Sequence, residues 1–126
     1  MFDGACVLCV GSARRLMAAD RSGRFDLAAS QGVAGRAALV AAGLNPDDPE
    51  SFVLIEGGRA FVRSDAVIAV LSGLGGAWRA AGAVRLIPRP LRDAAYLAVA
   101  RNRFRLFGRR PSCWVPDAEQ ARRVLP

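Results

Sequence analysis

Two cysteines lie three residues apart near the start of the chain, in the run Phe2-Asp3-Gly4-Ala5-Cys6-Val7-Leu8-Cys9. The residues that follow place apolar side chains at helical spacing, so the pair is predicted to begin a helix over 5–22. Positions i and i+3 share one face of a helix, which makes the two sulfurs neighbours. The N-terminus of a helix also carries a partial positive charge, which favours a thiolate over a thiol. Spacing and position therefore predict a redox-active dithiol.

The composition excludes several other kinds of site. All 18 basic residues are arginine, and the 126-residue chain has no histidine and only three cysteines. No His-assisted hydrolase, His general base or His-ligated zinc site can be built from it. Cys6, Cys9 and Cys113 are too few for a four-thiolate zinc site in one monomer, although a metal site shared between two chains is left open. We expect no metal and no organic cofactor.

The first residues and the hydropathy bear on the compartment. The start of the chain does not resemble a signal peptide, and no run of about 18 apolar residues predicts a transmembrane helix. We therefore expect a cytoplasmic protein. Thiols are kept reduced in the cytoplasm, so a Cys-x-x-Cys pair there is more often catalytic or metal-binding than a structural disulfide.

Apolar periodicity and turn residues predict alternating helices and strands after the cysteine pair. We expect strands over 24–28, 52–55 and 60–63, and helices over 31–44 and 64–76, the latter with Ser64 as N-cap. The run 52–55 is typical of a buried strand, Gly57-Gly58 of a hairpin turn, and 45–49 of a turn cluster. With a strand before the first helix, this order predicts an α/β fold with a thioredoxin-like sheet and flanking helices.

That first strand has little sequence to form it. A strand needs about five residues, whereas only Met1 and Phe2 precede Asp3. Either the first strand is short and nearly absent, or the natural start of the protein lies upstream of Met1. We favour the second interpretation.

The positive charge of the chain is concentrated in one segment. Residues 79–110 contain nine arginines and a single acid, Asp93, within a net charge of +7. A short helix near 78–85 and a longer one over 90–107 are predicted there, with an aromatic stripe that packs on the core. Arg101, Arg105 and Arg109 repeat every four residues on another face, which predicts an anion-binding surface. We expect one domain, 1–126, in which a redox body (1–76) carries a basic helical extension (77–126) packed on it.

Several motifs together resemble one family. The pattern of Asp3, Cys6 and Cys9 is similar to the signature of the DCC family of thiol–disulfide oxidoreductases, which is named for an Asp and two Cys. The similarity continues in the blocks 64–66, 88–96 and 100–109 and covers essentially the whole chain. The resemblance implies a thioredoxin-like fold and a dithiol active site, and it implies little about the substrate.

Chemistry suggests a role for each thiol and for Asp3. Cys6, nearest the helix terminus, is expected to be accessible and to act as the attacking thiolate, and Cys9, on the buried stripe, to resolve the mixed disulfide. Asp3 either accepts a proton from Cys9 during resolution, or it caps the helix or holds the loop, and these roles remain open. Cys113 is either a buried apolar residue or a second resolving thiol.

Two functions of different classes fit these features. The leading hypothesis is a thiol–disulfide oxidoreductase that acts on a protein or small-molecule thiol or disulfide. The alternative is a non-catalytic binding module whose arginine-rich arm docks on RNA, an anionic membrane or an acidic protein, with the cysteine pair as a redox-sensitive staple. The sequence predicts neither the direction of the redox reaction nor the oligomeric state.

Overall fold

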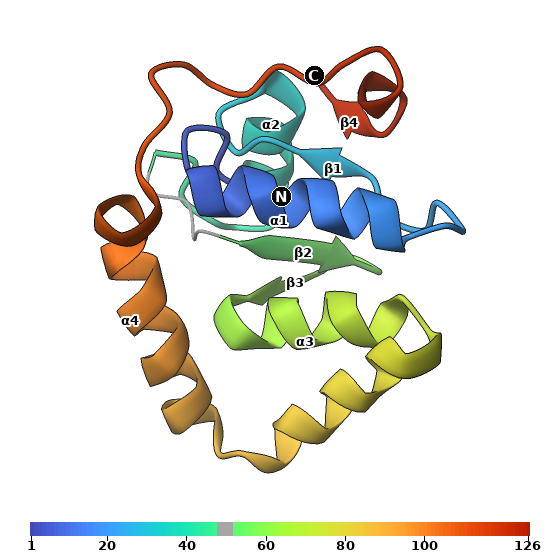
Figure 1. Ribbon diagram of the computed structural model, residues 1–126, viewed down its shortest axis with the longest axis vertical. Coiled ribbons are helices and arrows are strands. Elements are labelled where there is room, and N and C mark those ends of the chain that lie inside the picture. The colour runs from blue at the N-terminus through green and yellow to red at the C-terminus, as the bar shows by residue number, and fades with distance from the viewer. Residues whose placement is uncertain (48–51) are drawn as a thin grey trace.

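The computed structural model describes residues 1–47 and 52–126 and shows a mixed α/β chain (Figure 1). The described residues form the α-helices α1 (Val7–Ala19), α2 (Val33–Ala41), α3 (Arg63–Gly73) and α4 (Arg89–Phe107). They also form the 3₁₀-helices η1 (Gly76–Leu86) and η2 (Gln120–Arg122), and the strands β1 (Leu27–Ala28), β2 (Val53–Glu56), β3 (Arg59–Val62) and β4 (Val124–Leu125). The predicted helices are confirmed with bounds that differ by a few residues. Positions 48 and 49 of the predicted turn cluster lie outside the described residues.

A β-hairpin forms where the sequence predicts it. β2 and β3 pair in antiparallel register, with Val53 opposite Val62. Gly57 and Gly58 join them with φ angles of 57° and 75°, the conformation that a tight hairpin turn requires and that glycine adopts without strain. The prediction that the first of these strands is buried throughout is wrong: Val53 is buried, but Ile55 is 37% exposed, because the turn end of the hairpin projects from the body.

Phe2 takes the place of the missing first strand. Its backbone bridges Ala29 in the parallel sense and Phe52 in the antiparallel sense. The Phe2 N–H donates to Ala28 O at 3.1 Å, and the Ser30 N–H donates to Phe2 O at 2.9 Å. A single residue thus connects the β1 side of the structure to the β2 side, directly before the cysteine motif.

The C-terminal end returns to the start of the chain. β4 pairs in parallel with β1, with Val124 opposite Leu27, a pairing that the sequence does not predict. Arg123, next to β4, forms an ion pair with the buried carboxylate of Asp20 at the end of α1. The two ends of the sequence therefore stabilise each other.

Polar contacts join the start of α4 to α3. The prediction that Ser64 caps α3 is wrong, because the helix begins one residue earlier and the Ser64 hydroxyl donates instead to Asp93 of α4. Asp65 forms ion pairs with Arg92 at 2.9 Å and Arg89 at 3.2 Å. Part of the positive charge of the extension is therefore balanced within the chain.

The core forms around α1 and takes side chains from the C-terminal extension. Its buried members are Phe2, Cys6, Cys9, Val10, Ala13 and Leu27. Phe104 of α4 and Trp114 pack against this cluster, and the ring centroids of Phe2 and Trp114 lie 5.8 Å apart. The prediction that the aromatic stripe of α4 packs on the core is only partly confirmed: Phe104 packs there, but Phe107 is 47% exposed. No helix within 1–47 or 52–126 is long and apolar enough to cross a membrane.

Candidate active site

The cysteine pair lies at the N-terminal end of α1, as predicted. Cys6 is the N-cap residue, with extended backbone, and its Sγ accepts the backbone N–H of Cys9 at 3.3 Å. A side-chain hydrogen bond also joins the two sulfurs, and both thiols are free. Cys6 therefore takes the capping place that Ser or Asp fills in most helices, so its sulfur faces the helix N-terminus.

The expectation that Cys6 is the accessible sulfur is wrong. Cys6 is fully buried, at 0% exposure. The segment after α4 crosses the motif loop: the Arg110 N–H donates to Ala5 O at 2.8 Å, and the Trp114 N–H donates to Gly4 O at 3.0 Å. This segment, residues 109–114, covers the sulfur that an isolated helix start would expose.

Asp3 holds the motif loop in place. Its Oδ1 accepts the N–H of Ala5 at 2.9 Å and the side-chain amide of Gln31 at 2.7 Å. Its Oδ2 forms an ion pair with Arg103 of α4 at 3.3 Å. Gln31 in turn accepts the Gly4 N–H at 3.1 Å. These contacts agree with one role expected for Asp3, that of holding the loop, and the role of proton acceptor for Cys9 stays a prediction.

The surroundings of Cys9 favour its neutral thiol. Burial is the largest cause that raises the pKa of Cys9, to about 12, followed by the hydrogen bond and the charge of Cys6 and by the charge of Asp3. The positive charge of Arg103 acts in the opposite direction and lowers this pKa. Cys9 therefore keeps its proton at neutral pH.

Two residues of this site were not predicted from the sequence. The sequence predicts Arg103 only as one arginine of the basic helical extension, yet its guanidinium forms an ion pair with Asp3. The sequence does contain a signal for Arg103. It follows Tyr96 by seven positions and Ala100 by three, which places it on their face of the helix and not on the face of Arg101, Arg105 and Arg109. Gln31 lies just before α2, and no pattern in the sequence distinguishes it.

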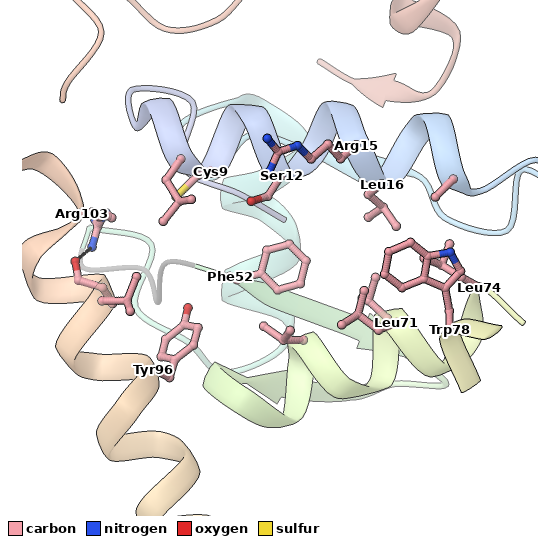
Figure 2. Close-up of a pocket in the computed structure, with 16 residues that line it drawn as sticks. Cys9, Ser12, Arg15, Leu16, Phe52, Leu71, Leu74, Trp78, Tyr96 and Arg103 are labelled. Atoms are coloured by element: carbon pink, nitrogen blue, oxygen red, sulfur yellow. Dashed lines mark hydrogen bonds between the residues drawn. The ribbon is translucent and has the colours of Figure 1, made fainter. Parts of the chain in front are cut away.

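An apolar cavity of about 520 Å³ adjoins the pair and was not predicted. α1, α3 and α4 surround it, with Phe52 between them (Figure 2). One side is lined by apolar side chains of α3 and the residue after it, Val67, Val70, Leu71 and Leu74. Cys9 lines the end nearest α4.

Cys113 lies on the segment that covers the motif loop. It is exposed, so the interpretation of Cys113 as a buried apolar residue is wrong. A side chain on Gly4 would begin 3.8 Å from the Cβ of Cys113, which places this third thiol beside the loop. Its use as a second resolving thiol stays a prediction.

The three arginines predicted to bind anions differ in their surroundings. Arg101 and Arg105 are exposed on α4 and form no ion pair with another described residue. The guanidinium of Arg109 lies over the ring of Phe104, 4.4 Å from its centroid, and the Arg109 backbone forms a bridge with Cys6. Anion binding by this surface stays a prediction.

Comparison with known proteins agrees with the motif. A family model described as DCC1-like thiol-disulfide oxidoreductase matches residues 1–109. The chain is 35% identical over 126 residues to an uncharacterized Bacillus subtilis protein, YuxK, across 100% of this chain and 92% of that protein. It is also 35% identical over 114 residues to a chloroplastic DCC family protein of Arabidopsis thaliana, across 90% of this chain and 66% of that protein. No solved structure matches the chain. With its motif residues together at the start of α1, the chain belongs to the DCC1-like thiol-disulfide oxidoreductase family.

Proposed function

We propose that this chain exchanges disulfides through the Cys6–Cys9 pair, with a thiol or disulfide compound as its substrate. The observation that carries the proposal is the contact of two free thiols at a helix start, where Cys6 Sγ lies 3.3 Å from the amide nitrogen of Cys9. The two side chains also share a hydrogen bond, so the sulfurs are neighbours that can join in a disulfide, and the helix N-terminus stabilises the thiolate that exchange requires. Membership of the family supports the same chemistry.

The proposal includes a thioredoxin-like arrangement of the chain. Phe2 bridges a parallel neighbour on one side and an antiparallel neighbour on the other, and the cysteine motif follows it directly. A hairpin and a helix, α3, come next after α2. This order and these directions support the thioredoxin-like fold.

The two sulfurs take different charges in this proposal. Cys6 Sγ accepts an N–H at the positive end of α1, a position that stabilises a negative charge formed on Cys6. Cys9, whose pKa is raised mainly by burial, stays protonated. When a Cys6–Cys9 disulfide is attacked at Cys9, Cys6 therefore leaves as the stabilised thiolate.

A redox titration tests the proposal. The protein is equilibrated in glutathione buffers of graded potential, and its thiols are then alkylated and located by mass spectrometry. Cys6 and Cys9 are expected to become oxidised together, with the two-electron slope of roughly 30 mV for a tenfold change in ratio. Exposed Cys113 provides the internal comparison, since it should titrate apart from them. Separate oxidation of Cys6 and Cys9, or no oxidation, would contradict the proposed function.

Asp3→Asn is expected to lower the pKa of the Cys9 thiol, because the charge of Asp3 is one of the causes that raise it. The new amide keeps an oxygen that can accept the Ala5 N–H, so the loop retains part of its support. The measurement is the rate of Cys9 alkylation against pH, in a background where Ser replaces the other two cysteines. Asp26→Asn, at an exposed carboxylate, is the matched control. An unchanged Cys9 titration would show that Asp3 acts on the loop alone.

A further inference from the structure

The apolar cavity gives access to one sulfur of the pair. Cys9 lines the cavity, whereas Cys6 does not line it and is fully buried. Figure 2 places Cys9 of α1 and Arg103 of α4 toward one end and Trp78 toward the other. A compound that occupies this space therefore meets the pair at Cys9.

The lining defines the chemistry of such a compound. Most of it is apolar, with side chains that include Leu16, Phe52, Val70, Leu71 and Trp78. Its charged members among the described residues are Arg15 and Arg103, both positive, so the cavity offers no carboxylate to a cationic ligand. Its volume of about 520 Å³ lies within the range of small-molecule sites, roughly 300–1,000 Å³. A small aliphatic compound fits these properties, and a polar or cationic one does not.

We propose that the Cys6–Cys9 disulfide is reduced by a small aliphatic dithiol that binds in this cavity and attacks Cys9. The inference rests on the proposed function, because it requires that the pair form a disulfide. It adds the class of substrate, the sulfur that the substrate reaches, and the direction in which electrons move.

The step balances with these atoms alone. A thiolate of the dithiol attacks Cys9 Sγ, a substrate–Cys9 bond forms, the Cys6–Cys9 bond breaks, and the electron pair leaves on Cys6 Sγ. The second thiol of the substrate then attacks the substrate sulfur of the mixed disulfide, and Cys9 leaves and takes up a proton. The substrate becomes a cyclic disulfide, and two electrons pass to the cysteine pair. One of the two substrate protons ends on Cys9 and the other in solvent, because Cys6 is released as a thiolate.

Two dithiols that differ only in polarity test the substrate class. Butane-1,4-dithiol and dithiothreitol share a four-carbon skeleton, and the second carries two hydroxyl groups. The rate at which each reduces the oxidised protein is divided by its rate with glutathione disulfide, which corrects for intrinsic reactivity. Because an apolar site discriminates against added hydroxyls, the corrected rate is expected to be about tenfold or more higher for butane-1,4-dithiol.

A pair of variants tests the route. Ser12 is exposed, lines the cavity and follows Cys9 by three positions on α1, and a side chain in a helix leans toward the preceding turn. Ser12→Phe should therefore fill the approach to Cys9 and slow reduction by butane-1,4-dithiol about tenfold or more, since small displacements of a reacting group cost this much. Ala18→Phe, at an exposed position of α1 that does not line the cavity, should change the rate less than about twofold.

The reduction potential separates the possible results. Ser12→Phe should leave the potential of the pair unchanged, because the contacts of the two sulfurs with each other remain. Equal corrected rates for the two dithiols, or a Ser12→Phe protein as fast as the unmodified chain, would overturn the inference and leave the proposed function intact. Failure of both dithiols to reduce a pair that equilibrates with glutathione would overturn the inference alone, and failure of the pair to form a disulfide would overturn both.

Discussion

Cys6→Ser and Cys9→Ser proteins are both expected to lose disulfide exchange. The Cys9 thiol that remains in the Cys6→Ser protein should nevertheless react faster with an apolar thiol reagent than the Cys6 thiol that remains in the Cys9→Ser protein. Exchange is lost because neither variant can form the internal disulfide. Labelling differs because the two sulfurs differ in access: Cys9 lines the cavity, whereas Cys6 lies under residues 109–114 and is fully buried. The reagent is S-butyl methanethiosulfonate, and the exposed Cys113 is replaced by Ser in both proteins.

The denatured proteins supply the reference for this experiment. The labelling rate of each folded variant is divided by its rate in concentrated urea, which removes the difference in reactivity that the two thiols have in the unfolded chain. We expect this ratio to be at least about tenfold higher for Cys9, because Cys6 becomes reachable only when residues 109–114 open locally. If Cys6 is labelled as fast as Cys9, the covering segment is no barrier, and Cys6 would be the sulfur that meets the substrate, as the sequence alone suggested.

The elements that the sequence predicts well are those that depend on nearby residues. The helix after the cysteine pair follows from its apolar spacing, and the hairpin follows from Gly57-Gly58 between two apolar runs. Propensity is less reliable where a distant partner competes. Ser64 is a good N-cap type, but it donates to Asp93, 29 positions away, and the helix begins without it.

The parts of the site that the sequence does not predict depend on contacts across the whole chain. The cover over Cys6 requires Arg110 to reach Ala5, and the support of Asp3 requires Arg103, 100 positions further along. Local periodicity places Arg103 on a different helix face from Arg101 and Arg105, which remain exposed, but it does not identify Asp3 as the partner of Arg103. The place of the pair at a helix start could therefore be predicted, whereas the burial of Cys6 and the cavity beside Cys9 required the structure.

Asp20→Asn is expected to lower the free energy of unfolding by about 3 kcal/mol, because it breaks a buried ion pair between distant parts of the chain. The Asp20 carboxylate accepts the backbone N–H groups of Phe25 at 2.9 Å and Arg24 at 3.1 Å, and it pairs with Arg123 beside β4. An amide cannot balance the charge of Arg123, and it replaces one of the acceptor oxygens with a donor. Urea denaturation followed by circular dichroism measures the change.

The pH dependence of the free energy of unfolding shows whether Asp20→Asn acts by removing a charge or by disturbing the packing. Burial raises the pKa of Asp20, but the N–H groups of Phe25 and Arg24, the Ser22 hydroxyl and the charge of Arg123 outweigh burial and lower it. A carboxyl whose pKa is lower in the folded chain contributes stability that is complete above its unfolded pKa of about 3.9 and is lost as the pH falls through the folded value.

Acidification below about pH 4 should therefore bring the free energies of unfolding of the unmodified chain and the Asp20→Asn variant closer together, since only the unmodified chain loses this contribution. Asp26→Asn, at an exposed carboxylate, is the matched control and should stay within about 0.5 kcal/mol of the unmodified chain at neutral pH. A difference between Asp20→Asn and the unmodified chain that stays constant down to low pH would show that the ionised carboxylate contributes nothing beyond its packing, and the link between α1 and the C-terminal strand would not be ionic.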